Sequence, residues 1–483
     1  TNRLFEYLQN WTGERDYDVI QFISRIGKGS NAQISLLNYE MDIEGVERIA
    51  VSDSQQVMLY PRDKRITMKK DLDFIFDGRI NAGLFSYWGQ GYNFDYQGFR
   101  IDMPQIDSMR FKVREFNPPL GERASLVNVQ TVLQDLQGQL MIDHPNNKSS
   151  KKFYPEYPIF QTLNSSFVYY DDKKIHNGIY DRSKFYMAVE PFTLDSLDNT
   201  TTDGLLFDAY FQSAGIFPQF QQPLMVMPDY SLGFSTSLPS ISNYKGKGTF
   251  AGQIELSSKG LHAEGHISYL QSVIFSPNIL MFPDDAQGKC VAFNIEEGFN
   301  NKGHPEVIGR DNPFHWFPYE DYLETSSREV PFEMYGAENV FAEVNLIYGP
   351  RGLFGTGEIC YLTAKHNSKN EGYSFFRRSF ESKHQDFRVK TVPNDKQWAF
   401  KMLNSSAHID FDKRQGVFDK IDKYSFIEFP TNQYIAYMDH AEWDMNLAKV
   451  NVKRNQDDAA YLVSTHPLQD SLDFEAAFLR FDL

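Results

Sequence analysis

The sequence predicts a mainly β protein, built as an extended β-solenoid or as open β-sandwich or jelly-roll modules in series, with a short helical segment at the N-terminus. Three observations support this prediction. Apolar and polar residues alternate over long stretches, a motif recurs in the second half of the chain, and aromatic residues make up 15% of the 483 residues. Aromatic rings pack well on a pleated sheet, and alternation indicates strands with one buried face.

The first segment, residues 1–40, is the part that we expect to be helical. Asp16 or Asp18 can cap an apolar run that ends at Gly27, which is typical of the start and stop of a helix. The apolar residues of this run are Val19, Ile20, Phe22, Ile23 and Ile26. A second amphipathic stretch at 31–39 extends the helical prediction.

The second segment, residues 41–216, is expected to form a first β region. Apolar and polar residues alternate around 74–84, and the same pattern continues through Tyr92, Phe94 and Tyr96. Gly98 then shifts the phase of the alternation by one residue, which indicates a β-bulge or a tight bend.

Residues 217–240 are the expected boundary between two β regions. This segment holds four prolines, Pro218, Pro223, Pro228 and Pro239. Proline cannot donate a backbone hydrogen bond and is confined to turns and strand edges. Residues 241–483 are expected to form the second β region.

The second β region contains a repeated unit at about 250–270 and 341–362. Both copies carry the motif G-L-x-x-x-G-x-I-x-Y-L, which begins at Gly260 and at Gly352. A repeated strand–turn–strand unit predicts a modular β architecture, because each unit buries its apolar face against its neighbours.

A degenerate third copy of the unit is indicated near the start of the first β region. Residues 76–82 precede Gly83, and a Gly-rich turn at Gly89 and Gly91 then leads into Tyr92. If this copy is present, the same unit is used in both β regions.

Four aromatic residues, Trp88, Tyr92, Phe94 and Tyr96, are the candidate ligand-binding residues. Exposed rings in this segment would form a platform for carbohydrate or lipid. Core packing is the alternative, because the alternation places the rings of Tyr92, Phe94 and Tyr96 on one face.

We predict no catalytic residue, no metal site and no cofactor. His262 and His266 lie in a strand pattern, in which four residues span roughly 13 Å, whereas a zinc–nitrogen bond is about 2 Å. The motifs G-x-S-x-G and H-E-x-x-H and the P-loop do not occur in the sequence. A glycoside hydrolase with its two carboxylates on distant strands remains the enzymatic alternative.

Charge and cysteine usage narrow the partners and the compartment. The net charge of −16 argues against a nucleic-acid partner and against a polybasic membrane contact. Cys290 and Cys360 are expected to be free thiols, with one long-range disulfide as the alternative. The chain opens on Thr1 without an initiator Met, as expected of a processed protein or a piece of a longer one.

The full repeat, F-A…(I/V)-x-L…G-L-x-x-x-G-x-I-x-Y-L, resembles the strand–turn units of large β-rich cell-envelope proteins, among them the OstA-like and AsmA/TamB-like groups. The overall sequence pattern of residues 41–450 is similar to that of very long envelope proteins of Bacteroidetes. This pattern includes the segments 51–55 (VSDSQ) and 429–434 (FPTNQY). This resemblance implies open β-jelly rolls or β-grooves of stacked parallel strands. The bulky Phe and Tyr residues on the apolar face argue against a continuous lipid channel.

The resemblance also implies a function and a location. It favours a non-enzymatic scaffold or assembly component, exported to the periplasm or the outer membrane, with proteins of these compartments as partners. A lipid- or lipopolysaccharide-conducting groove is the first alternative, and a glycan-binding or adhesive surface protein is the second. Three Asp-Ser-apolar triplets, at Asp107, Asp195 and Asp470, resemble a glycosylation motif of exported Bacteroidetes proteins and support export.

Overall fold

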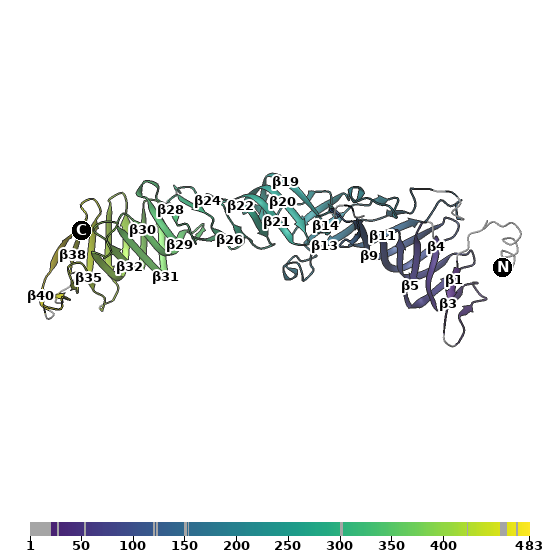
Figure 1. The fold of residues 1–483 in the computed structure, drawn as a ribbon, viewed down its shortest axis with the longest axis horizontal. Coiled ribbons are helices and arrows are strands. Elements are labelled where there is room, and N and C mark those ends of the chain that lie inside the picture. Colours follow the sequence, from purple (N-terminus) through teal and green to yellow (C-terminus); the bar gives the residue numbers. More distant parts are fainter. Residues whose placement is uncertain are drawn as a thin grey trace. The chain divides into compact units, whose positions relative to one another are not determined.

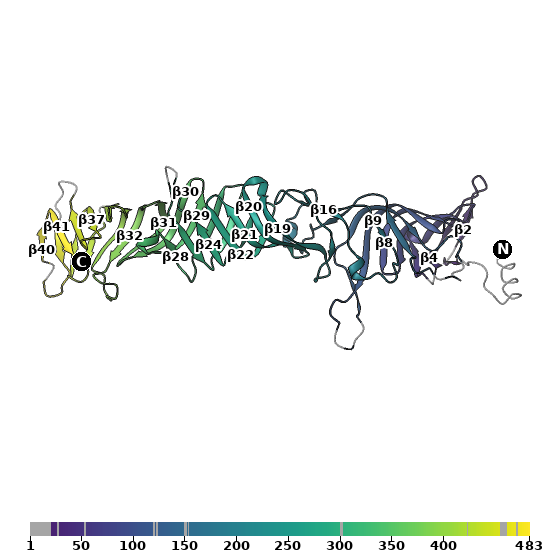
Figure 2. The ribbon, with the colours of Figure 1, turned by 90° about the horizontal axis from the view of Figure 1, so that it is seen from above.

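The computed structural model of the protein describes residues 21–26, 29–52, 55–118, 121, 124–148, 152, 154–299, 303–422, 424–454, 461–469 and 472–483. Their regular structure consists of strands and of five 3-10 turns, which confirms the mainly β prediction (Figure 1, Figure 2). The turns are η1 (Arg62–Lys64), η2 (His176–Gly178), η3 (Thr202–Gly204), η4 (Tyr244–Gly246) and η5 (Gly336–Glu338). Within the described residues, no helix is long and apolar enough to cross a membrane.

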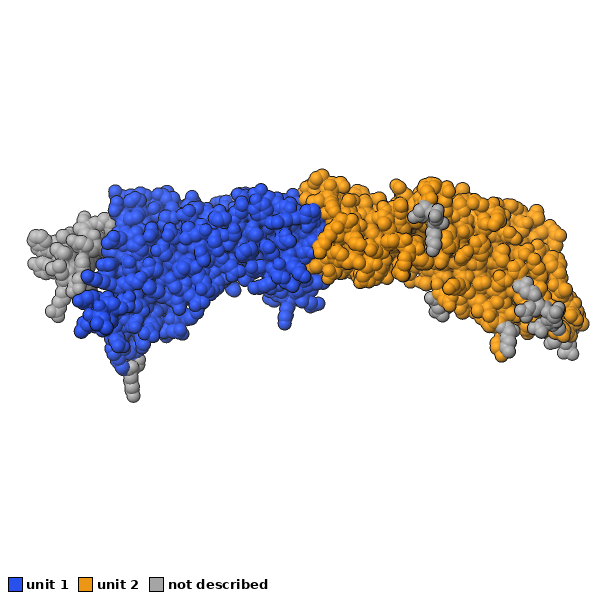
Figure 3. Space-filling view, turned by 180° about the vertical axis from the view of Figure 1, so that it is seen from behind, with its two compact units in different colours: residues 1–236, 255–261 blue, residues 237–254, 262–483 orange. Residues whose placement is uncertain are grey.

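The chain divides into two compact units (Figure 3). Unit 1 comprises residues 1–236 and 255–261, and unit 2 comprises residues 237–254 and 262–483. The division near residue 236 falls within the Pro-rich segment 217–240. That segment contains short strands and the beginning of a long one.

The strands of unit 1 are β1 (Gln21–Ser24), β2 (Ala32–Ile34), β3 (Met41–Glu44), β4 (Val46–Ser52), β5 (Val57–Pro61), β6 (Arg65–Met68), β7 (Phe74–Ala82), β8 (Phe85–Asp95), β9 (Arg100–Arg114), β10 (Leu126–Asn128), β11 (Leu133–Met141), β12 (Ile159–Thr162), β13 (Ser166–Tyr169), β14 (Phe185–Val189), β15 (Thr193–Leu194), β16 (Ala209–Ser213), β17 (Phe220–Gln221) and β18 (Met225–Val226). Strands β7, β8, β9 and β11 form a continuous antiparallel ladder. Two rows of short strands, β1–β4–β5 and β2–β3–β6, lead into β7. Two further rows, β12–β15 and β13–β14–β16–β17, start from β11.

The remaining strands are β19 (Leu232–Asn243), β20 (Gly248–Ser257), β21 (Gly260–Tyr269), β22 (Ser272–Met281), β23 (Ala286–Lys289), β24 (Ala292–Ile295), β25 (Val307–Arg310), β26 (Pro313–Phe317), β27 (Tyr322–Ser326), β28 (Phe332–Met334), β29 (Val340–Gly349), β30 (Gly352–Tyr361), β31 (Ala364–Phe376), β32 (Ser379–Val389), β33 (Phe400–Asp410), β34 (Gln415–Lys420), β35 (Ile427–Phe429), β36 (Tyr434–Ala436), β37 (His440–Asp444), β38 (Lys449–Lys453), β39 (Tyr461–Ser464), β40 (Asp473–Glu475) and β41 (Phe478–Asp482).

Unit 2 follows the same plan of ladders and rows. The rows β23–β26–β27 and β24–β25–β28 both start from β22 and meet again on β29. Strands β29 to β33 then form a ladder. The rows β34–β37–β38–β41 and β35–β36–β39–β40 both start from β33.

The core is made by one face of each long strand. In β7 and β8, Phe74, Phe76, Tyr92 and Phe94 are at most 3% exposed. Their rings meet across the two strands, with centroids 4.6 Å apart for Phe74 and Phe94 and 5.4 Å apart for Phe76 and Tyr92. Aromatic cross-strand pairs stabilise a sheet by roughly 0.2–1 kcal/mol each. The predicted alternation of buried and solvent-facing residues is therefore confirmed.

The repeated motif forms the same kind of strand twice, as β21 and as β30. The second glycine of the motif adopts a left-handed φ in each copy, 153° at Gly265 and 138° at Gly357. A Cβ atom at Gly265 would lie 2.3 Å from the carbonyl oxygen of Ala251, and one at Gly357 would lie 2.3 Å from that of Glu343. Only glycine fits this close approach to the neighbouring strand, which explains the motif.

The hairpin of β7 and β8 has the position predicted for the third copy, with Gly83 in its turn at a φ of 55°. One detail of the prediction was wrong. Gly89 and Gly91 lie inside β8, not in a turn. The chain remains a strand there because the pairing registers of β7–β8 and β8–β9 each shift near Gly89. Gly98 lies in the turn between β8 and β9, which confirms the predicted tight bend.

The helical prediction for the N-terminal segment is wrong wherever the structure describes it. Residues 21–24 form β1, which pairs with β4, and residues 32–34 form β2, which pairs with β3. Short runs rich in Ile are compatible with either a helix or a strand. Here the edges of β3 and β4 supply backbone hydrogen-bond partners, and these partners favour the strand. Residues 1–20, with the proposed caps Asp16 and Asp18, lie outside the described residues.

The strand direction also differs from the expectation that the resemblance raised. The pairs described above are antiparallel throughout, whereas the resemblance implied stacked parallel strands. Short turns explain this direction, since two-residue connections such as that between β29 and β30 can join antiparallel strands only.

Candidate functional site

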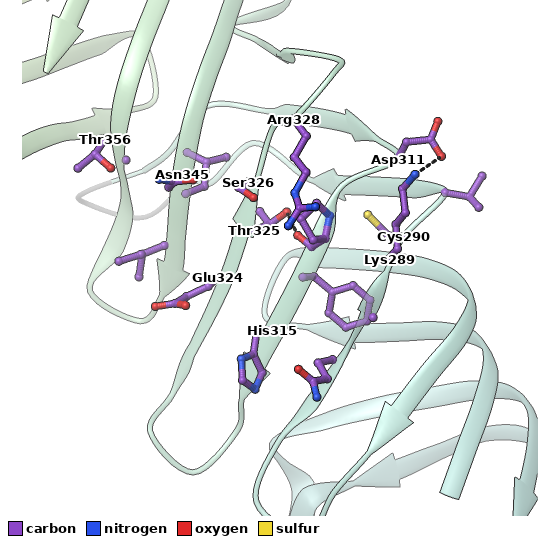
Figure 4. Close-up of a pocket in the computed structure, with 18 of the residues that line it drawn as sticks. Lys289, Cys290, Asp311, His315, Glu324, Thr325, Ser326, Arg328, Asn345 and Thr356 are labelled. Carbon is purple, nitrogen blue, oxygen red and sulfur yellow. Dashed lines mark hydrogen bonds and ion pairs between the residues drawn. The ribbon is translucent and has the colours of Figure 1, made fainter. Parts of the chain in front are cut away.

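The outward face of unit 2 carries an open hollow of about 1180 Å³ (Figure 4). Side chains of β21 to β23, β26, β27 and β29 to β31 line it. The volume exceeds the roughly 300–1,000 Å³ of a small-molecule pocket. The hollow is therefore sized for a segment of a larger ligand.

One row of side chains runs across the strands through the hollow. Gln287 on β23 pairs with His315 on β26, and His315 pairs with Glu324 on β27. The row continues from Glu324 to Ile347 on β29 and from Ile347 to Phe354 on β30. Neighbouring strands lie about 4.8 Å apart, so the row spans roughly 19 Å.

One end of this row is apolar and exposed. Ile347 and Phe354 lie directly opposite each other on β29 and β30, and they are 42% and 38% exposed. Asn345 and Thr356 form the next outward pair along the same two strands. The hollow thus has an apolar pair at one end of the row and polar side chains along the rest of it.

His315 is held in place by two contacts. Its Nε2 atom lies 2.8 Å from Oδ1 of Asp285, and its ring packs at a tilt of 39° on Phe317, with centroids 3.9 Å apart. The carboxylate is therefore engaged by the imidazole, and the imidazole keeps one orientation beside Glu324 (Figure 4).

The opposite end of the hollow carries charged groups of both signs. Lys289 and Asp311 form an ion pair at 3.8 Å, and Arg328 extends into the hollow from the loop after β27 (Figure 4). The ion pair is exposed and contributes little to stability. Together these groups give the rim a mixed charge.

The thiol of Cys290 lines the same end but is not activated. Its Sγ atom lies 3.1 Å from the carbonyl oxygen of Asn312, and burial raises the pKa of the thiol. Burial, followed by the charge of Glu358, likewise raises the pKa of Cys360, to about 11. Both cysteines are free, as predicted, although Cys360 is only half-buried. Thiolates are the reactive form, so this chemistry favours neither residue as a nucleophile.

The four aromatic residues predicted to bind a ligand do not share one exposed surface. Tyr92 and Phe94 are fully buried in the core of unit 1, where burial raises the pKa of the Tyr92 hydroxyl. Tyr96 is half-buried beneath Lys148, whose Nζ lies 5.3 Å from the ring centroid. Trp88 is half-buried on the outward face of β8.

His262 and His266 lie on strand β21, as the alternation predicted. The Nδ1 atom of His262 lies 2.8 Å from Oδ1 of Asn278, and the ring of His266 packs on Phe275. The two imidazoles therefore have separate partners. Among the described residues, no group of three or more His, Cys, Asp or Glu side chains could hold a metal ion.

Sequence reasoning missed the hollow, because it is assembled from residues far apart in the chain. One signal was available in the repeat. His262 and Phe354 occupy equivalent positions in the two copies of the motif, and both line the hollow. A position that differs between two otherwise similar copies can mark a surface used for binding.

The chain matches no protein-family model and no curated protein sequence.

Proposed function

We propose that the protein is a non-enzymatic scaffold or assembly component of the bacterial cell envelope, exported to the periplasm or the outer membrane. In this proposal, the hollow of unit 2 holds a segment of a partner protein. The observation that carries the proposal is the exposed apolar pair Ile347 and Phe354 on a well-packed sheet. Protein interfaces commonly combine exposed apolar residues of this kind with neighbouring polar ones.

The groups around this pair suit recognition better than catalysis. Asp285 is bound to His315, and Asp311 is paired with Lys289. The Cys290 thiol is kept protonated by burial. A mixed rim of this kind selects a partner by charge complementarity and supplies no activated nucleophile.

The finer architecture of the proposal is an extended β-solenoid or a series of open β-sandwich modules. The recurrence of ladders and paired rows in both units supports a modular design. A repeat protein of this kind offers long outward faces on which several partners can assemble.

The packing of the apolar face counts against the lipid-conducting alternative. Phe76, Tyr87 and Phe94 are at most 3% exposed, and their rings fill the space between the strands. A lipid chain would need unfilled apolar volume along that face. Interiors this well filled hold few voids larger than a water molecule.

The proposal can be tested with a photo-crosslinking amino acid in the native cell. We expect p-benzoylphenylalanine at position 354 to crosslink to one envelope protein, in a membrane or periplasmic fraction. Phe341 is the matched control, because it lies on β29, is 46% exposed and does not line the hollow. The second substitution Ile347→Asp should abolish the adduct at position 354. Equal labelling from both positions, or a cytoplasmic location, would contradict the proposal.

A further inference from the structure

A ladder of alternating aromatic and guanidinium groups lies on the outward face of unit 1. The guanidinium carbon of Arg79 lies 4.3 Å from the ring centroid of Tyr60 and 6.0 Å from that of Trp88. The guanidinium carbon of Arg110 lies 5.2 Å from the Trp88 ring. Arg79 is on β7 and Arg110 is on β9, so the two arginines flank Trp88 from the strands on either side of β8.

Strand β9 extends this ladder with further cations. Arg110, Lys112 and Arg114 occupy alternate positions and are all exposed. Successive outward side chains of a strand are roughly 6.7 Å apart, so the three charges form a straight line about 13 Å long. We call Arg79, Arg110, Lys112 and Arg114 the basic stripe.

The described residues around the basic stripe leave its cations without ion-pair partners. Within the part of the chain that the structure describes, none of its four cations forms an ion pair. Two carboxylates lie near the ends of this line of charges, Asp107 on β9 and Glu115 directly after it. Asp107 accepts a hydrogen bond from Gln105 at 3.0 Å, and Glu115 accepts one from Ser125 at 2.8 Å. The cross-strand neighbours of Arg110, Lys112 and Arg114 are the uncharged residues Ser86, Asn128 and Leu126.

Stacking changes what this surface can bind. Two guanidinium groups lie over the Trp88 indole, so a sugar would compete with them for stacking on that ring. The contact with the ring restrains Arg79 and Arg110; Arg79 has its Nε buried, whereas Arg110 is exposed. A guanidinium held in this way binds carboxylate or sulfate in a bidentate manner at a lower entropic cost.

We propose that the basic stripe binds a linear acidic polysaccharide. Its regular spacing along one strand suits a polymer with charges repeated along its length. The protein carries a net charge of −16, so a wide anionic membrane surface would be repelled by the rest of the molecule. A single polymer chain can contact the stripe and avoid most of that repulsion, because salt screens charges beyond about 10 Å at 0.1 M.

The test uses the full chain and polygalacturonate as the probe, with affinity measured by biolayer interferometry at several salt concentrations. The double variant Arg110→Gln and Lys112→Gln should weaken binding about tenfold at low salt. It should also lower the slope of log affinity against log salt by about half, since two of the four cations are removed. Unchanged affinity and slope would overturn the proposal.

Arg182→Gln is the matched control. Arg182 also lies in unit 1 and stacks on an aromatic ring, that of Tyr169 at 4.6 Å, but its guanidinium is paired with Asp171 at 2.6 Å. This variant should change polygalacturonate affinity less than twofold. A loss as large as that of the double variant would show that net charge alone drives binding, and would overturn the proposal.

Two further experiments test which ligand the basic stripe binds and whether the hollow contributes to this binding. Neutral dextran, single-stranded DNA and phosphatidylserine vesicles should bind at least tenfold more weakly than polygalacturonate, and equal binding of any of them would overturn the assignment. The variant Ile347→Asp should leave polygalacturonate binding unchanged. The polysaccharide proposal can therefore be overturned while the scaffold proposal stands, and the scaffold proposal can be overturned while the polysaccharide proposal stands.

Discussion

At the scale of single residues, a buried imidazole in unit 2 makes a pH-dependent contribution to stability. His366 is fully buried, with Nε2 2.9 Å from the hydroxyl of Tyr361 and Nδ1 2.7 Å from Oε1 of Gln385. These contacts suit a neutral ring that donates to Gln385 and accepts from Tyr361. Burial lowers the pKa of His366 from 6.5 to about 3.

This pKa predicts a loss of stability in mild acid. Between pH 6.5 and about 3, the unfolded chain binds a proton at His366 that the folded chain does not bind. The free energy of unfolding should therefore fall by about 1.4 kcal/mol per pH unit as the pH drops through this window, and it should be unaffected by this group above pH 6.5. Urea unfolding at pH 7.5 and 5.5 would measure the effect.

The variant His366→Gln isolates this contribution from the other titrating groups. It removes the imidazole, so the stability difference between wild type and variant should shrink by about 1.4 kcal/mol on going from pH 7.5 to 5.5. An identical difference at the two pH values would show that His366 does not carry the predicted linkage.

At the scale of elements, the close approach of each motif strand to its neighbour depends on one glycine. Gly357 has a φ of 138° and faces the carbonyl oxygen of Glu343. We expect Gly357→Ala to lower the free energy of unfolding by about 1–3 kcal/mol, because the backbone would be strained and the strands pushed apart. Chemical unfolding followed by tryptophan fluorescence would measure this loss.

Gly204 supplies the control for this substitution. It is exposed in η3, has no left-handed φ, and a Cβ atom there would meet only Oγ1 of Thr201 at 3.6 Å. Gly204→Ala should change stability by less than about 1 kcal/mol. If Gly357→Ala were equally harmless, the motif glycine would not be required for this close approach.

At the scale of the whole molecule, the two units have separate aromatic cores and should not unfold in one transition. Proteins with several compact units commonly depart from two-state behaviour. Phe94 in unit 1 and Phe387 in unit 2 are both fully buried. We expect Phe94→Leu and Phe387→Leu each to destabilise mainly its own unit, by about 1–2 kcal/mol.

Two spectroscopic probes can distinguish the units. In a background in which Trp11 and Trp88 are replaced by Phe, the remaining tryptophans, Trp316, Trp398 and Trp443, all lie in unit 2. Fluorescence then reports on that unit, whereas far-UV circular dichroism reports on both. Phe387→Leu should shift the fluorescence transition, and Phe94→Leu should shift only the circular dichroism transition. Equal shifts of both probes in both variants would indicate a single cooperative unit.

Local pattern by itself determined the class of the fold, the alternation of buried and outward residues, and the repeat. The periodicity of strands such as β7 and β21 can be read from adjacent residues. The motif glycines indicate positions with a positive φ and a close neighbouring strand, which only glycine accommodates. The same reasoning offered core packing as the alternative for Tyr92, Phe94 and Tyr96, but it did not predict how far Trp88 is exposed.

Only the tertiary structure decided which residues meet on a surface and how the N-terminal segment folds. His315, Ile347 and Phe354 form one row because of the strand register, and a one-residue slip would have turned them to the opposite face. β1 and β2 are strands because β3 and β4 offer them an edge. Arg79, Trp88 and Arg110 form a ladder because three strands stand side by side. Each outcome depends on pairing between residues distant in the chain, which local periodicity does not encode.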